Sequence, residues 1–141
     1  MNRQLRKGFS LIEMVIVILI LGIIAAVAAP RMFDTASTAE QNTTRQQLAV
    51  LRNAIEMHRA QTGSYPAKDA LETSMAALLN GPFPSPSIGS VRGKTGVYYD
   101  TTTTGVPVVP DPTVTTAGWA YKPANGSLKL NVLTPDTGFD W

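Results

Sequence analysis

An apolar run near the N-terminus constrains this chain more than any other feature. Residues 14–29 contain no polar side chain, and Leu11 and Ile12 extend the run with Glu13 as its one interruption. A helix needs about 20 apolar residues to cross a hydrocarbon core. Because basic residues precede the run, we predict a cytoplasmic N-terminus and export of everything that follows. A conventional secretory signal, cleaved near Ala26-Val27-Ala28, is the alternative interpretation.

A helical, amphipathic pattern follows from about Asp34 to Ala60. At about 100° per residue, one half of the helix circumference collects mainly apolar side chains and the other half polar ones. The first set is Leu48, Val50, Leu51, Ala54, Ile55, Met57 and His58. We therefore predict one long helix from about Ser10 to Ala60, ended by the glycine and proline of Thr62-Gly63-Ser64-Tyr65-Pro66.

The remaining residues predict a small head. We expect a short helix over 67–79, a strand over Val97-Tyr98-Tyr99 and a proline-interrupted loop over 101–116. Asn125-Gly126 separates two alternating runs, 119–121 and 128–132, which is a strong hairpin signal. The predicted fold class is α+β, with the long N-terminal helix packed against a small antiparallel β-sheet.

This pattern and the family resemblance described below together imply four segments. They are a basic leader peptide over residues 1–8, a transmembrane and assembly segment over 9–31, the amphipathic half of the helix over 32–60, and a globular head over 61–141 that includes the C-terminal hairpin.

The composition excludes several classes of function and of binding site. The chain has no cysteine, which excludes disulfides, a thiolate nucleophile and cysteine-ligated metals. The net charge of +2 depends on Arg3, Arg6 and Lys7, and the other charged residues are scattered, so no nucleic-acid partner is expected. Residues 89–95 have one residue too few between their glycines for a phosphate-binding loop. His58 has no second histidine or cysteine as a partner, and we expect no catalytic residue and no enzyme.

The junction Arg6-Lys7-Gly8-Phe9-Ser10-Leu11-Ile12-Glu13 resembles the class III signal peptides of the type IV pilin superfamily. This resemblance implies that a prepilin peptidase cuts between Gly8 and Phe9 and methylates the new N-terminal Phe9. It also implies that Glu13 directs assembly by pairing with the amino terminus of a neighbouring subunit. A carboxylate inside an apolar span costs about 3 kcal/mol, so a compensating partner is expected on physical grounds as well. A glutamate that only reaches toward the membrane edge is the alternative.

Gly22 and Pro30 resemble the helix-loosening positions of many pilins. In a helix interior they cost about 1 and 3 kcal/mol relative to alanine. Both residues are also common in ordinary membrane helices, so their spacing alone does not assign this role.

Further resemblance concerns the head. Residues 51–58 with 62–66 look like the helix exit of the major pseudopilins of type II secretion, and 118–126 looks like a pseudopilin hairpin. Many type IV major pilins close a C-terminal loop with two cysteines, which this chain lacks. Major pseudopilins bind calcium in a C-terminal loop, so Asp136 and Asp140 are calcium candidates. Two carboxylates are few for that cation, and a solvated tail with no cofactor is the main expectation.

The resemblance implies a structural subunit of a pseudopilus in a type II secretion-like system. Expected partners are prepilin peptidase, further copies and other pseudopilins, the inner-membrane secretion platform and membrane lipid. Expected localisation is a single-pass inner-membrane protein with its head outside the cytoplasm, and then a periplasmic or surface filament. The alternatives are a type IV pilin for adhesion, motility or DNA uptake, and a membrane-anchored binding module or enzyme that uses a pilin-like export signal.

Overall fold

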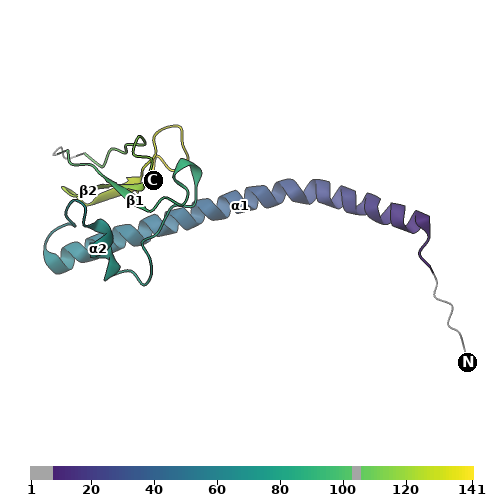
Figure 1. Cartoon of the computed structure of the whole chain (residues 1–141), viewed down its shortest axis with the longest axis horizontal. Coiled ribbons are helices and arrows are strands. Elements are labelled where there is room, and N and C mark those ends of the chain that lie inside the picture. The colour runs from purple at the N-terminus through teal and green to yellow at the C-terminus, as the bar shows by residue number, and fades with distance from the viewer. Residues whose placement is uncertain (1–7, 103–105) are drawn as a thin grey trace, which may run out of the picture. The chain divides into compact units, whose positions relative to one another are not determined.

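The computed structural model describes residues 8–102 and 106–141, so most of the expected leader, residues 1–7, lies outside the described residues. The chain divides into two compact units, Met1–Thr38 and Ala39–Trp141. The element order is α1 (Leu11–Thr62), α2 (Leu71–Ala76), a short 3-10 helix (Gly89–Val91), β1 (Gly96–Tyr99), β2 (Ala117–Lys122) and β3 (Ser127–Leu130), as Figure 1 shows. The predicted α+β class with one long N-terminal helix is confirmed.

The boundaries of α1 have local causes. Ser10 directly precedes the helix, and its backbone N–H is bound by the Glu13 carboxylate. At the other end Gly63 adopts a φ of 81°, and its N–H donates to the carbonyl of Arg59 at 2.8 Å. A glycine in the left-handed region is the usual way to end a helix. The predicted stop at residues 62–66 is therefore confirmed.

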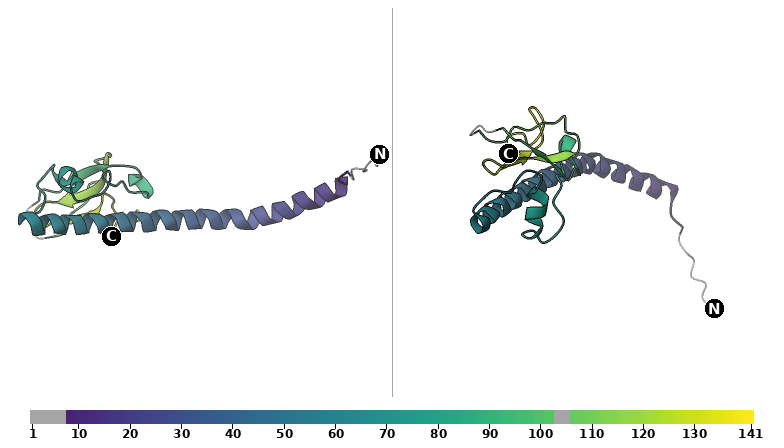
Figure 2. Two further views of the ribbon diagram at one scale, coloured as in Figure 1. Left: turned by 90° about the horizontal axis from the view of Figure 1, so that it is seen from below. Right: turned by 60° about the vertical axis from the view of Figure 1, so that its left-hand side comes forward.

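The C-terminal half of α1 buries a narrower face than predicted. Its buried side chains are Thr44, Leu48, Leu51, Ala54 and Ile55. Val50 and Met57 were expected on this face but are each 52% exposed. The prediction was wrong for these two because they lie at the edge of the apolar arc, where α2 and the sheet do not cover the helix. α2 and the sheet cover this half of α1 from the same side, and the Leu71 N–H at the start of α2 donates to the Tyr99 hydroxyl of β1 at 3.1 Å (Figures 1 and 2).

The three-stranded sheet has the order β1-β2-β3 and is mixed. β2 and β3 form the predicted antiparallel hairpin, whereas β1 pairs with β2 in parallel, so the expectation of an antiparallel sheet was wrong for β1. Parallel neighbours need a connection of a dozen or more residues. The segment between Tyr99 and Ala117 is long enough to return the chain to the end of the sheet from which β1 began.

The hairpin turn needs its glycine. Gly126 has a φ of 71°, and a Cβ at this position would collide with the ring of Tyr65. Left-handed backbone and close packing together explain the Asn125-Gly126 signal.

The expected helix over 67–79 is shorter in the structure, where it is α2. No side chain caps its start at Ala70. The chain turns after Ala77, where the N–H groups of Leu78 and Leu79 both donate to the Met75 carbonyl.

Polar side chains fasten the sheet to α1 and to the loops. The Trp119 indole donates to the Pro84 carbonyl at 2.8 Å, and the Tyr121 hydroxyl donates to the Pro66 carbonyl at 3.0 Å. Arg52 on α1 donates to the Leu128 carbonyl from Nε and Nη2, at 3.1 and 2.8 Å. The buried apolar core contains Leu48, Leu51, Ala54, Ile55, Leu71, Met75, Ile88, Val91, Trp119, Tyr121, Leu128, Leu130 and Val132.

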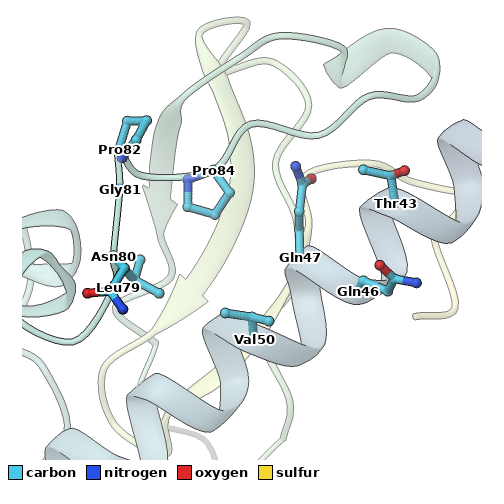
Figure 3. Close-up of a pocket in the computed structure, with 9 residues that line it drawn as sticks. All are labelled: Thr43, Gln46, Gln47, Val50, Leu79, Asn80, Gly81, Pro82 and Pro84. Atoms are coloured by element: carbon cyan, nitrogen blue, oxygen red, sulfur yellow. The ribbon is translucent and has the colours of Figure 1, made fainter.

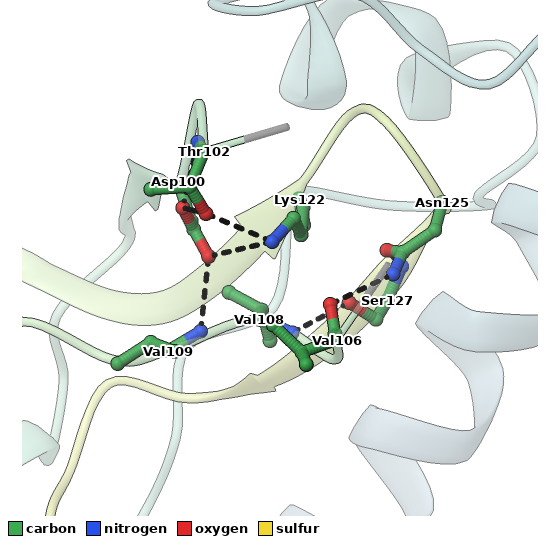
Figure 4. A network of polar contacts seen from close by, with 8 residues as sticks. All are labelled: Asp100, Thr102, Val106, Val108, Val109, Lys122, Asn125 and Ser127. Atoms are coloured by element: carbon green, nitrogen blue, oxygen red, sulfur yellow. Dashed lines mark hydrogen bonds and ion pairs between the residues drawn. The ribbon is translucent and has the colours of Figure 1, made fainter. Parts of the chain in front are cut away.

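A buried ion pair holds the long loop after β1 (Figure 4). Lys122 Nζ lies 3.4 Å from Asp100 Oδ2, and both side chains are almost fully buried. The ammonium also donates to the Thr102 hydroxyl, and Asp100 accepts hydrogen bonds from Thr102 and from the Val109 N–H. Burial alone would raise the pKa of Asp100, but the hydrogen bonds from Thr102, Val109 and Lys122 outweigh it and lower the pKa to about 2.

A fragment that starts at Asp34 should be soluble, monomeric and folded, because it keeps the buried face of α1 and the whole core that covers it. Circular dichroism and analytical ultracentrifugation measure the two properties. A fragment that is unfolded, or that polymerises without the apolar segment, would contradict this expectation.

The same fragment should lose stability as the pH falls from about 4 to about 2. The folded-state pKa of Asp100 lies below its unfolded value of about 3.9, so its stabilising contribution is complete above pH 4 and disappears on protonation. Asp100→Asn leaves Lys122 charged and buried without its counterion, which should cost about 3–5 kcal/mol at pH 6 and flatten the acid dependence. Thermal unfolding from pH 6 to pH 2 tests this, with the exposed Asp140→Asn as control. An unchanged acid profile in Asp100→Asn would refute the assignment.

Candidate processing and assembly site

The N-terminal unit presents an apolar helical surface that none of its described residues, 8–38, covers. The large apolar side chains from Leu11 to Phe33 are all exposed, from 45% at Val17 to 82% at Leu11. By its length and composition, α1 is long and apolar enough to cross a membrane. A surface of this kind requires lipid or other helices around it.

The expected processing junction lies just before α1. Gly8 and Phe9 are in neither helix nor strand, both are exposed, and Phe9 is 75% exposed. A protease needs an extended, accessible peptide bond, and a bond inside a helix does not meet that need. The junction therefore has suitable geometry, while the roles of Gly8 and Phe9 remain predictions.

Glu13 has a local partner that the sequence reasoning missed. Its Oε2 accepts a hydrogen bond from the Ser10 backbone N–H at 3.0 Å. Glu13 stands three residues after Ser10, so this is the reciprocal half of a capping box. The signal was present in the sequence as Ser-x-x-Glu before an apolar run. The carboxylate thus satisfies one free N–H group and lies at the positive end of the helix dipole.

Gly22 and Pro30 both lie inside α1. A Cβ placed on Gly22 would meet no atom of the described residues within 4 Å, so no contact among them demands glycine there. Pro30 has no N–H to donate to the carbonyl four residues earlier, so the helix lacks one hydrogen bond at this point. Both features are compatible with the predicted loosening of the helix, which stays a prediction.

The calcium candidates do not form a cluster of ligands. Asp136 accepts a hydrogen bond from the Ser90 hydroxyl at 3.0 Å, and Asp140 is exposed. Within residues 8–102 and 106–141, no group of three or more His, Cys, Asp or Glu side chains could hold a metal ion. These two carboxylates therefore give no structural support to the calcium prediction.

The head carries a groove that sequence reasoning did not find. It runs along α1 opposite the segment 78–84, and we call it the α1 groove; Figure 3 shows its larger part. It has a larger part of about 350 Å³ and a smaller part of about 210 Å³, which share Val50 and Leu79. Its lining residues are Thr43, Gln46, Gln47, Val50, Asn53, Ala54, Met57, Leu78, Leu79, Asn80, Gly81, Pro82 and Pro84.

Two family patterns match the chain in succession. The prokaryotic N-terminal methylation motif matches residues 3–29, and the pattern of type II secretion system (T2SS) protein G matches residues 31–103. The first covers the junction and the apolar half of α1. The second covers the amphipathic half of α1 and the first part of the head.

Curated relatives come from both secretion systems and pili. Type II secretion system core protein G of Aeromonas hydrophila is 32% identical over 65% of this chain and 62% of its own length. Fimbrial protein EcpC of Eikenella corrodens is 34% identical over 72% of this chain and 65% of its own length. The type IV narrow pilus major component PilA5 of Thermus thermophilus is 35% identical over 70% of this chain and 75% of its own length.

The chain thus spans slightly less than two thirds of the first two of these relatives. No solved structure gives a significant match. The protein G pattern covers more than half of the residues and begins at residue 31, just after the methylation motif ends at residue 29. The chain therefore belongs to the type II secretion system protein G family.

Proposed function

We propose that this protein is a structural subunit of a pseudopilus that supports protein export through a type II secretion-like system. The observation that carries the proposal is the contrast within α1. Its first part exposes apolar side chains throughout, whereas its second part buries a face against a head with its own core. A subunit of this kind is complete only when other helices surround its first part.

We propose a separate role for each of the four segments of the sequence. Residues 1–8 form a leader that is removed, 9–31 anchor the subunit in the membrane and then pack in the filament, 32–60 form the base of the head, and 61–141 form its exposed remainder. In lipid, helices gain little from the hydrophobic effect on association, so packing and polar contacts must select the neighbour. This requirement gives Glu13 its proposed importance.

The proposed partners follow from this cycle. A prepilin peptidase cuts after Gly8 and methylates Phe9, an inner-membrane platform receives the processed subunit, and copies of the chain with other pseudopilins form the filament. Lipid surrounds the anchor before assembly, with the head outside the cytoplasm. We propose no proton-transfer step in this cycle and no enzymatic activity for this protein.

A type IV pilus subunit is the second candidate. The 35% identity to a pilus component, with 75% coverage of that relative, favours it specifically. The two proposals share the same N-terminal chemistry and differ in the length of the filament and in its partners. Imaging of filaments from cells overproducing the chain, with immunolabelling, distinguishes short or absent surface fibres from long pili.

Gly22 and Pro30 are proposed to let the helix bend or lose hydrogen bonds as the subunit leaves the membrane. The space around Gly22 supports this proposal, because an added Cβ would meet no atom of the described residues within 4 Å, and packing among those residues does not require glycine.

The mature chain should begin at Phe9 and carry a methyl group on its nitrogen. Intact-mass measurement and N-terminal sequencing of the membrane-extracted protein test this, with a strain that lacks prepilin peptidase as control. A mature protein that begins near Pro30 would instead indicate conventional signal-peptidase cleavage and overturn the proposed processing.

Two substitutions at Glu13 should separate its two roles. Glu13→Gln keeps a side-chain oxygen that can accept the Ser10 N–H but removes the charge, whereas Glu13→Leu removes both. If the charge pairs with the amino group of Phe9 in a neighbouring subunit, both variants should be processed and inserted normally and both should lose filament assembly. An opposite charge is attracted more strongly as the local dielectric falls.

Processing, membrane fractionation and filament yield are measured in the same cells, with wild-type protein as reference. Normal filaments from Glu13→Gln would show that the capping hydrogen bond is sufficient and that no charge pair directs assembly. Normal filaments from both variants would leave helix packing as the determinant.

A further inference from the structure

The chain contains two Asn-Gly dipeptides, Asn80-Gly81 and Asn125-Gly126. An asparagine followed by glycine is chemically reactive, because the main-chain nitrogen of the glycine can attack the side-chain amide and close a succinimide ring. Glycine has no Cβ to obstruct the attack, and it gives the backbone the freedom that ring closure needs. The reacting groups are the same in both dipeptides, so a large difference in their reactivity has to come from the fold.

The fold restrains both reacting groups at Asn125. The side-chain Oδ1 accepts a hydrogen bond from the Ser127 N–H at 3.0 Å, and Nδ2 donates to the Val106 carbonyl at 3.1 Å (Figure 4). The attacking nitrogen is held as well, since the Gly126 N–H donates to the Lys122 carbonyl at 2.9 Å. Ring closure at Asn125 therefore requires the loss of three hydrogen bonds.

Asn80 has none of these restraints. It is exposed and lies in neither helix nor strand. Among the described residues, its side-chain amide has no hydrogen-bond partner and the Gly81 N–H donates to no carbonyl. A Cβ placed on Gly81 would meet none of their atoms within 4 Å, whereas one placed on Gly126 would collide with the ring of Tyr65. The described part of the head thus leaves Asn80 and Gly81 free to reach the geometry of the attack.

We propose that Asn80 is a site of spontaneous deamidation. The Gly81 nitrogen gives up its proton and attacks the side-chain carbonyl carbon of Asn80, so that a new C–N bond forms. The bond from that carbon to the amide nitrogen breaks, and the amide leaves as ammonia. Water then opens the succinimide ring at either carbonyl and leaves aspartate or isoaspartate. The reaction consumes one water molecule, releases one molecule of ammonia and needs no oxidant or reductant.

Deamidation would place a charge at the α1 groove. Asn80 lines the larger part of the groove, on the wall that faces α1 (Figure 3). All the described side chains that line the groove are uncharged. Because the released ammonia is lost to solvent, the negative charge accumulates as the head ages, whether or not the subunit assembles. This inference therefore goes beyond the proposed function and does not depend on it.

Time courses on the full-length chain test the proposal. The protein is extracted from membranes in detergent and incubated at neutral and at alkaline pH, and peptide mass spectrometry measures the deamidated fraction at each asparagine. Asn80 should convert at least about tenfold faster than Asn125, since three hydrogen bonds must be lost before the attack at Asn125. Both rates should rise with pH, because the attacking nitrogen must lose its proton.

A denatured sample separates the effect of the fold from that of the local sequence. In concentrated urea the hydrogen bonds at Asn125 are lost, so its rate should rise toward the rate at Asn80. A rate at Asn125 that stays equally slow in the folded and the denatured chain would overturn the structural explanation.

Two variants give a matched control. Asn80→Gln keeps an uncharged amide but can react only through a larger ring that forms more slowly, so aged samples should lose the acidic form that isoelectric focusing detects in wild-type protein. Asn80→Asp carries the charge of the product from the start and marks the position of that form. Because Asn80 is exposed, both variants should fold.

The outcomes are independent of filament assembly. Equal rates at Asn80 and Asn125 in the folded chain, or an acidic form that persists in Asn80→Gln, would overturn the deamidation proposal and leave the proposed function standing. Absence of filaments would overturn the proposed function, and the conversion of Asn80 measured in the same protein would still support its deamidation.

Discussion

The packing of one face of α1 against the head is the interaction on which the rest of the structure depends. Leu48, Leu51 and Ile55 are almost fully buried, and the sheet, α2 and the 3-10 helix all contribute to the core that covers them. A 52-residue helix in water would otherwise expose apolar side chains along its whole length. Because the head satisfies only the C-terminal part, the N-terminal part remains dependent on lipid or on other subunits.

The sequence predicted the parts of this fold that arise from local chemistry. The apolar run, the helix stop at Gly63 and the Asn125-Gly126 turn all follow from side-chain type and backbone preference. The parallel pairing of β1 with β2 could not be predicted in this way, because it depends on the path of the long loop. The exposure of Val50 and Met57 was also missed, since periodicity gives a face of the helix but not the width of the element that covers it.

The candidate site likewise has features that residue order predicts and features that it does not. The accessible junction at Gly8 and Phe9 and the apolar surroundings of Glu13 could be read from residue order. The Ser10–Glu13 hydrogen bond follows a known local pattern and was overlooked, whereas the α1 groove joins residues about thirty positions apart and has no local signature.

The head also shows how a chain without cysteine holds a long loop, with the buried Asp100–Lys122 pair in place of a covalent link. Such a pair favours one loop geometry, since any other arrangement leaves a buried charge unpaired.

The capping role of Glu13 changes what processing would accomplish. In the unprocessed chain the nitrogen of Phe9 belongs to a peptide bond and carries no charge, and among the described residues the Glu13 carboxylate has the Ser10 N–H and the helix dipole as its local partners. Cleavage after Gly8 would create an amino group one residue before Ser10 and would also remove the basic leader. The carboxylate would then face a full positive charge, either its own or that of a neighbour at the same depth. In a low dielectric that attraction exceeds a single neutral hydrogen bond, so the proposed cleavage would itself create the electrostatic condition for assembly.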